Sequence, residues 1–291
     1  MVSPDAGLVY ACLTHVPLWL PQPPWVSTIH LGQAQGNGLL NLRDLAPEWE
    51  PHHPVLGGTA GSFALRRYIL KHRPDATRVG ICQYRKFVSR RRVGGAPDPK
   101  YRVMDVIYVP TLDREAYARH LDPGDSRFVL SAPLHFTRLP WYRRGYLKEY
   151  ARDHEVHDLL RFTAAAVEQG VLGQREVEAF FNEDVFMPGG VELGVFPADF
   201  WLESIAAIEQ VVRTCVDLYP LAREGDQARA WAFCAERLGS WMLLRRLRAE
   251  AATGVLSRHW AWLNRRIWSH RHVGQLNLLT QDPNHRGYSV K

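Results

Sequence analysis

The chain has 291 residues, of which 46% are hydrophobic and 23% are charged. This is the composition of an ordinary globular protein, and it excludes a disordered, collagen-like or small disulfide-stapled chain. The net charge of +6 and the pI of about 9.2 favour anionic partners such as phosphates, nucleic acid or an acidic membrane surface, without selecting one of them.

Four cysteines lie far apart along the chain, at Cys12, Cys82, Cys215 and Cys234. They form no C-x-x-C pair, and three of them have apolar neighbours, so we expect reduced thiols in the core. The N-terminus lacks the basic start of a signal peptide, and no run of about 18 apolar residues occurs. These features predict a cytoplasmic protein without a membrane-spanning segment.

In chain order, the first elements are short strands separated by long loops. Apolar runs predict strands at residues 8–13 and 26–29, and the first strand ends at Thr14-His15. Residues 32–61 are rich in Gly, Asn and Pro and predict no clear element beyond a turn at residues 42–44. The glycines at residues 57–61 match neither a dinucleotide-binding nor a Walker motif, so the motif assigns them no nucleotide role.

The stretch at residues 78–87 is the most informative part of the chain. A helix predicted at residues 62–72 leads into an apolar run, which changes at once into Gln83-Tyr84-Arg85-Lys86. This order predicts a buried strand with polar side chains at its carboxyl end, where open α/β sheets bind ligands. Two cations and a phenol suit an anionic ligand, because Arg can hold phosphate oxygens in two hydrogen bonds. A solvated strand end is the alternative.

Strands continue to alternate with helices through the middle of the chain, which favours a mostly parallel sheet. The predicted strands are residues 103–109, 127–132, 184–187 and 192–196, and the predicted helices are residues 114–120, 147–169, 174–180, 200–219 and 226–252. The fold class is therefore α/β, with a Rossmann-type central sheet flanked by helices and a helical C-terminal part.

Residues 251–291 differ in composition from the rest. Trp260, Trp262 and Trp268 lie among Arg and His residues, so we divide the chain into a domain at residues 1–250 and a basic, Trp-rich extension at residues 251–291. Such a segment suits contact with nucleic acid, with an anionic membrane surface, or with the protein core through its Trp side chains.

Metal and nucleophile motifs are sparse. His154 and His157 stand at a spacing that could place both on one helix face, with Asp158 next to them, but they do not form the H-E-x-x-H motif. A metal-dependent hydrolase using these residues stays open as an alternative. The chain contains neither D-x-D nor a G-x-S-x-G elbow, so we assign no residue as a metal ligand.

Six segments in order resemble a bacterial family of capsule and exopolysaccharide biosynthesis proteins, whose members look like glycosyltransferases of the GT-A type. The matching segments are Leu13-Thr14-His15, then Gly80-Ile-Cys-Gln-Tyr-Arg-Lys-Phe87 for the family's Gly-Leu-x-His-Tyr-Arg-Arg-Tyr-Phe, Met104-Asp105-Val106-Ile107, Tyr150-Ala-Arg-Asp-His154, Phe181-Asn-Glu-Asp-Val-Phe-Met187 and Glu236-Arg237-Leu238. Gln83 and Lys86 depart from the family pattern, which has His and Arg there.

The resemblance implies a nucleotide-sugar-dependent glycosyltransferase acting in bacterial surface polysaccharide or natural-product glycosylation. We expect donor binding by His15, Tyr84, Arg85, Lys86 and Asp105. The catalytic candidates are Glu236 and Asp184, while His154 and Asn182 are expected at the acceptor or sugar. Glu236 has a structural alternative as the ion-pair partner of Arg229 or Arg237.

The expected partners are a UDP-sugar donor and a glycan or lipid-linked acceptor. Contact of the C-terminal segment with the inner face of the membrane is an additional expectation, and nucleic acid is not expected. Mn²⁺ or Mg²⁺ stays open as a cofactor despite the missing D-x-D. A degenerate, non-catalytic nucleotide- or nucleic-acid-binding protein is the main alternative.

Overall fold

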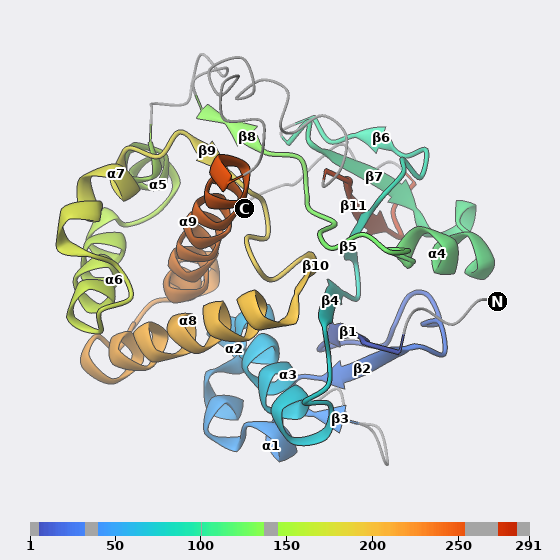
Figure 1. The fold of residues 1–291 in the computed structure, drawn as a ribbon, viewed down its shortest axis with the longest axis horizontal. Helices are drawn as coiled ribbons and strands as arrows, with labels where there is room; N and C mark the ends of the chain where they lie inside the picture. Colours follow the sequence, from blue (N-terminus) through green and yellow to red (C-terminus); the bar gives the residue numbers. More distant parts are fainter. Residues whose placement is uncertain (1–5, 33–39, 100, 137–144, 254–272, 284–291) are drawn as a thin grey trace.

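A computed structural model describes residues 6–32, 40–99, 101–136, 145–253 and 273–283. It confirms the α/β class, with a mixed, mostly parallel central sheet flanked by helices (Figure 1). The sheet runs in the order β3-β2-β1-β4-β5-β11-β7-β6, and β10 also pairs with β4. Its strands are β1 Leu8–Thr14, β2 Val26–His30, β3 Leu40–Asn41, β4 Arg78–Gln83, β5 Lys86–Ser89, β6 Ala96–Pro97, β7 Met104–Tyr108, β10 Gly194–Pro197 and β11 Gln275–Thr280.

Helices cover both faces of this sheet. They are α1 Leu42–Leu45, α2 His53–Leu56, α3 Gly58–His72, α4 Arg114–Leu121, α5 Tyr146–Asp153, α6 Val156–Glu168, α7 Val177–Phe181, α8 Ala198–Leu218 and α9 Ala230–Thr253. Short 3₁₀ helices lie at η1 Pro47–His52, η2 Val109–Thr111, η4 Gln174–Glu176 and η5 Gly225–Arg229. A separate two-stranded sheet pairs β8 Leu134–His135 with β9 Val185–Phe186.

The central strands β1 and β4 are mainly apolar, as expected for strands with both faces buried. Every residue of β1 is buried, and alternate side chains enter two different cores. Val9 packs with α3, α8 and α9 on one face, while Tyr10 packs with α4 and β11 on the other. Gly80 of β4 leaves the room that the Tyr10 ring fills, since a Cβ on Gly80 would lie 2.1 Å from that ring.

β1 and β4 are adjacent and parallel, so their carboxyl ends lie side by side. Leu13 is in register with Gln83, and the chain continues from β1 into His15 and a Pro- and Trp-rich loop and from β4 into Tyr84 and Arg85. The strand predicted within residues 78–87 is confirmed as β4. β5, which follows it directly, was not predicted.

Residues 275–280 of the predicted extension form β11, which lies between β5 and β7 inside the central sheet. The C-terminal part of the chain therefore contributes a strand to the domain. Residues 254–272, which include the three Trp residues of the predicted basic segment, lie outside the described residues.

Three predicted elements differ from the structure. Residues 32–61 were expected to hold no clear element beyond a turn at residues 42–44, but their described part contains β3, α1, η1, α2 and the start of α3. Residues 127–132 make only isolated bridges, from Val129 to Val195 and from Leu130 to Val273. The helix expected at residues 147–169 is broken into α5 and α6, because His154 has extended backbone angles at the end of α5.

The four cysteines are buried and free, as expected for core thiols. Within the described part of the chain, no helix combines the length and the apolar character that crossing a bilayer would require.

Candidate functional site

Aromatic and imidazole rings gather where β1 and β4 end. His15 follows β1, and its ring lies 5.2 Å from that of Tyr84, which follows β4. Trp19 packs edge-on against Tyr84 at 5.3 Å, and His53, the first residue of α2, lies 5.9 Å from His15. Four rings from three segments therefore meet at the carboxyl edge of the sheet, where the sequence predicted a ligand.

Tyr84 and Arg85 form the tight turn between β4 and β5, since Gln83 pairs with Lys86 across it. Backbone hydrogen bonds hold this turn from both sides: the Tyr84 N–H donates to the Leu13 carbonyl at 3.0 Å, and the Leu279 N–H donates to the Arg85 carbonyl at 2.7 Å. The Arg85 guanidinium lies 5.6 Å from the centroid of the Tyr84 ring. Both side chains are half-buried and are fixed to the centre of the sheet.

The N-terminus of α3 faces the same region. Gly57 precedes the helix with φ of 54° and has no side chain to cap it, so the first N–H groups are left for another partner. A Cβ on Gly57 would lie 3.4 Å from Arg229 Nη2, and a Cβ on Gly58 would lie 2.7 Å from Gln83 Nε2. Arg229 and the end of β4 therefore lie beside the first turn of a 15-residue helix.

We define the His15 cluster as His15, His53, Tyr84, Arg85 and Arg229. Partial loss of hydration lowers the pKa of His15, and the positive charges of Arg85 and Arg229 lower it further. Burial lowers the pKa of His53, with a smaller contribution from His15. Both imidazoles therefore favour their neutral form. The guanidinium groups of Arg85 and Arg229 make the cluster electropositive, and Asp226, 3.9 Å from Arg229, offsets only one of these two charges. Such a site suits an anion.

Two carboxyl groups lie next to the His15 cluster. Glu192 is buried in the loop before β10, and its Oε1 accepts a hydrogen bond from Thr59 Oγ1 at 2.7 Å. Glu236 of α9 is half-buried, and its Oε1 accepts a hydrogen bond from the Gly189 N–H at 2.6 Å. Its predicted neighbour Arg237 pairs instead with Glu149 of α5, at 3.0 Å from Nε to Oε2. Arg229, the other partner considered for Glu236, lies 3.9 Å from Asp226, so each of the two arginines pairs with a different carboxylate.

His154 contacts the His15 cluster through one intervening ring. Its imidazole stacks on Phe233 with ring centroids 4.5 Å apart, and the Arg229 guanidinium lies 5.4 Å from the Phe233 ring centroid. Tyr150 packs on the other side of His154 at 4.8 Å. His154 is thus placed to support Arg229, and its predicted contact with a sugar stays a prediction.

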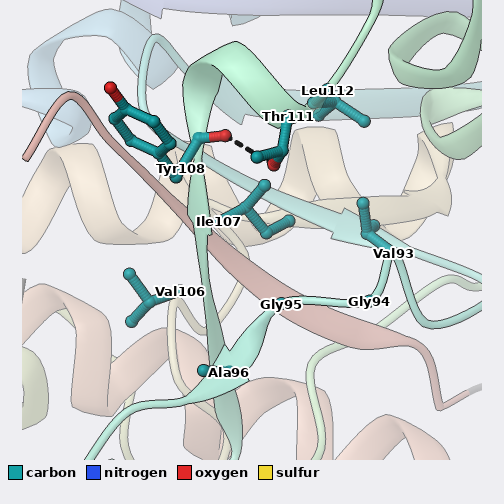
Figure 2. A pocket seen from close by; sticks show the side chains of 9 residues that line it. All are labelled: Val93, Gly94, Gly95, Ala96, Val106, Ile107, Tyr108, Thr111 and Leu112. Atoms are coloured by element: carbon teal, nitrogen blue, oxygen red, sulfur yellow. Dashed lines mark hydrogen bonds between the residues drawn. The ribbon is translucent and has the colours of Figure 1, made fainter. Parts of the chain in front are cut away.

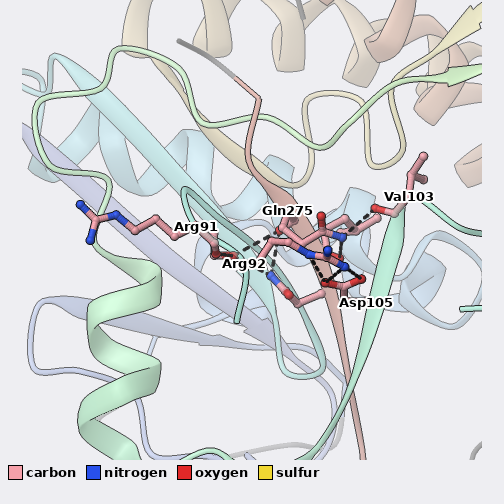
Figure 3. A network of polar contacts seen from close by, with 8 residues as sticks. Arg91, Arg92, Val103, Asp105 and Gln275 are labelled. Atoms are coloured by element: carbon pink, nitrogen blue, oxygen red, sulfur yellow. Dashed lines mark hydrogen bonds and ion pairs between the residues drawn. The ribbon is translucent and has the colours of Figure 1, made fainter. Parts of the chain in front are cut away.

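Asp105 lies elsewhere in the sheet. It is buried in β7, where its carboxylate forms an ion pair with Arg92 at 3.2 Å (Figure 3). β5 and β11 separate it from β4 in the strand order. The neighbouring Arg91 side chain extends away from this network. The structure gives Asp105 a structural ion pair and does not bring it to the His15 cluster.

The remaining predicted residues divide into two groups. Lys86 is half-buried at the start of β5 and directly follows Arg85. Asn182 is exposed at the end of α7, and Asp184 is half-buried immediately before β9, where its carbonyl accepts the Phe136 N–H at 2.9 Å. Asn182 and Asp184 therefore lie beside the small β8–β9 sheet.

The side chains of the alternative metal site, His154, His157 and Asp158, do not converge. His157 is exposed and contacts Glu155 at 2.7 Å, while Asp158 is buried against Arg223 at 2.7 Å. Among the described residues, no group of three or more His, Cys, Asp or Glu side chains is placed to hold a metal ion.

A hollow of about 340 Å³ lies at the β6–β7 edge of the sheet (Figure 2). It is lined by Val93, Gly94, Gly95, Ala96, Val106, Ile107, Tyr108, Thr111 and Leu112. None of these lining residues is charged, so the hollow offers no countercharge to a phosphate. The His15 cluster is the better candidate for an anionic ligand.

Sequence reasoning missed three residues of the site. His53 lay in a segment expected to be irregular, Arg229 was considered only as an ion-pair partner, and Glu192 was given no role. Gly57 and Gly58 also border the site, although their motif alone predicts no nucleotide contact. The sequence feature that could have indicated this site is the pair Gly57-Gly58 at the start of α3. A helix start without a side-chain cap leaves backbone N–H groups available to an anion.

Comparison with known proteins gives a likeness of fold. The chain superposes on the structure described as "WbbM bifunctional glycosytransferase apo structure" with a TM-score of 0.69 and 12% sequence identity. The match covers 94% of this chain and 45% of that protein, so this chain spans less than half of the other's length. No family model matches the chain, and no curated protein matches it in sequence. The fold is therefore glycosyltransferase-like.

Proposed function

We propose that the protein is a glycosyltransferase that moves a sugar from a nucleotide-sugar donor to a hydroxyl group of a glycan or lipid-linked acceptor. The observation that carries this proposal is the convergence of Arg85 and Arg229 on His15, beside the first turn of α3. The glycosyltransferase-like fold supports the reaction class. The cluster offers what a departing nucleoside diphosphate needs, namely fixed positive charge and backbone N–H donors.

The donor is held in this proposal by side chains of the β1 and β4 ends. Arg85 and Arg229 bind the diphosphate and stabilise the charge that develops as the sugar leaves. Tyr84 and Trp19 offer ring faces and edges to the nucleotide base, since flat amphipathic rings pack well on such groups. Lys86 adds a cation next to Arg85, and His15 contacts a phosphate oxygen. A UDP-sugar is the favoured donor.

The acceptor hydroxyl must lose its proton when it attacks the sugar. We assign this step to Glu236, whose carboxylate is oriented by the Gly189 N–H and lies on α9 one turn after Phe233. Asp184 is the second candidate for the base. His154 and Asn182 remain proposed contacts of the acceptor or sugar, whereas Asp105, which is buried against Arg92 away from the His15 cluster, is not given a donor contact.

The test is a thermal-shift screen of the whole chain against UDP, GDP, CMP and their common sugar conjugates, with and without Mn²⁺. A ligand present at 100-fold above its dissociation constant stabilises the folded state by about 2.7 kcal/mol. We expect one nucleotide class to raise the melting temperature and its sugar conjugate to be consumed when an acceptor is added. If an oligonucleotide raises the melting temperature and no nucleotide does, the proposal fails in favour of nucleic-acid binding.

A further inference from the structure

Glu192 is a buried carboxyl that the steps above do not use. Its contact with Thr59 joins the loop before β10 to the first turn of α3, across 133 positions in the sequence. Because Thr59 is the second residue of α3, this contact places the Glu192 carboxyl at the helix end that borders the His15 cluster.

The second oxygen of Glu192 lies beside Gly58, the first residue of α3, at the helix end that borders the His15 cluster. Glu192 Oε2 lies 3.5 Å from the position that a Cβ on Gly58 would occupy, and Gln83 Nε2 lies 2.7 Å from the same position. Gly58 has no side chain, so this residue puts nothing between the two polar groups and the backbone of the first helical turn. Glu192 Oε2 and Gln83 Nε2, which come from two different segments, therefore both lie beside the start of α3.

The groups around Glu192 decide its charge. Burial raises the pKa of Glu192 to about 8, and the negative charge of Glu236 on α9 acts in the same direction. The hydrogen bond from Thr59 of α3 and the positive charge of Arg229 on η5 oppose this rise without cancelling it. At neutral pH the carboxyl is therefore mostly protonated. Thr59 already donates to Oε1, so the proton belongs on Oε2, the oxygen that faces Gly58 and Gln83.

We propose that Glu192 is a neutral carboxylic acid that donates a hydrogen bond from Oε2 to the diphosphate of the bound nucleotide sugar, an inference that rests on the proposed function. An ionised carboxylate at this place would repel the diphosphate, whereas the neutral acid adds a donor to the charges of Arg85 and Arg229. A carboxyl group kept neutral in order to donate a hydrogen bond is an established use of a buried acid.

This role predicts a pH dependence of binding that lies above neutrality. Ionisation of Glu192 removes the donor and places a negative charge beside the phosphates. The affinity for the nucleotide therefore falls as the pH rises through about 8, and it falls by up to about tenfold for each pH unit once the acid is ionised. His15 and His53 have lowered pKa values and titrate on the acidic side, so they do not produce this fall.

The experiment measures UDP affinity by calorimetry between about pH 7 and about pH 8.5, below the pH at which the uracil ring ionises, and titration of the UDP phosphate is common to the wild type and every variant. For the wild type we expect the fall described above. Glu192→Gln imitates the neutral acid, so it keeps UDP affinity at about pH 7 to within a few fold and loses the fall at higher pH. Thr59→Val removes the hydrogen bond that favours the ionised form, so it moves the midpoint of the fall to higher pH.

Glu168→Gln is the control, because Glu168 is exposed near the end of α6 and should leave the pH profile unchanged. A fall that persists in Glu192→Gln overturns the proposal, and so does a loss of UDP affinity in that variant at about pH 7. If Glu192→Gln binds UDP normally but cannot turn over, Glu192 is a base and the neutral-donor role is wrong. Absence of binding by the wild type to every nucleotide overturns the proposed function itself, which distinguishes the two failures.

Discussion

Arg85 carries the most direct prediction at the scale of single residues. Its guanidinium projects from a turn that backbone hydrogen bonds hold on both sides, so Arg85→Ala removes a charge without removing the turn. We expect kcat/KM for transfer to fall by about 10²–10³, the cost typical of losing one donor to a developing charge. Arg91→Ala is the matched control because Arg91 is exposed and extends away from its neighbours. Near-normal turnover in Arg85→Ala would remove this residue from the mechanism.

Glu236 can be tested separately from donor binding. Glu236→Gln keeps an acceptor for the Gly189 N–H but cannot take a proton, so the loop before β10 should stay in place. We expect kcat to fall by about 10²–10⁴, the usual contribution of a general base, with nucleotide affinity changed by no more than a few fold. Steady-state kinetics and calorimetry measure the two quantities. An unchanged kcat would transfer the role to Asp184.

His15 links binding to pH on the acidic side. Its pKa is lowered in the free protein, so the imidazole is neutral at pH 7, and a bound diphosphate favours the charged form. Binding therefore takes up a proton on the acidic side of neutrality, and affinity for a nucleotide sugar rises as the pH falls there. Calorimetry in buffers of different ionisation enthalpy detects that proton. His15→Asn should abolish the uptake, whereas His120→Asn on α4, whose pKa is also lowered, should not.

At the scale of elements, an ion pair between Arg237 and Glu149 joins α9 to α5. The same helix α9 carries Phe233, the ring on which the Arg229 guanidinium packs. Arg237 and Glu149 are only 5% and 12% exposed, and the Arg237 guanidinium also lies 4.8 Å from the Tyr150 ring centroid. Removing one partner of such a pair leaves a buried charge uncompensated, which costs about 3–5 kcal/mol. We expect that loss in the unfolding free energy of Glu149→Ala.

Denaturant unfolding measures this cost, and the exposed pair of Glu115 and Arg119 on α4 provides the control. Glu115→Ala should change stability by no more than about 0.5 kcal/mol, as exposed helical pairs do. Because Phe233 lies on the same helix as Arg237, Glu149→Ala should also weaken nucleotide binding through Arg229. If Glu149→Ala and Glu115→Ala have the same unfolding free energy, water must solvate the Arg237 guanidinium when its partner is removed.

The sequence predicted well the helices whose apolar pattern extends over several turns and the strands that are buried on both faces. β1 and β4 are apolar on both faces, and α3, α8 and α9 extend over several turns. β5 was missed because it has four residues and begins inside a polar run. β11 was missed because its apolar stretch follows a segment dominated by Trp, Arg and His. The composition of that segment led us to assign the whole of residues 251–291 to a basic extension.

The sequence predicted which side chains follow β4, but it could not predict which distant side chains join them in the candidate site. Tyr84 and Arg85 follow a buried strand, and that rule places them at the carboxyl edge. The contacts of Thr59 with Glu192 and of Arg229 with the start of α3 join segments far apart in the chain, and no local pattern encodes them. The break between α5 and α6 is of the same kind, because it places His154 against Phe233 rather than on a helix face with His157.

At the scale of the whole molecule, β11 joins the two parts of the sheet. It lies between β5 and β7, so β7 and β6 are connected to the β1–β4 region through a strand from the far end of the chain. Leu278 of β11 is 3% exposed in the core on the α4 face. Leu278→Ala should lower the unfolding free energy by about 2–5 kcal/mol, the range for a buried leucine.

Leu70→Ala makes the same chemical change at a leucine that is 50% exposed on α3, and it should be nearly neutral. Hydrogen exchange then shows where the structure opens. If β11 is the link, exchange in Leu278→Ala accelerates more in β7, at residues 104–108, than in β2, at residues 26–30, because the β7–β6 side detaches before the rest of the sheet. Equal acceleration in both strands would mean that the sheet opens as one cooperative unit. In that case β11 would stabilise the His15 cluster directly, through its hydrogen bond to the Arg85 carbonyl.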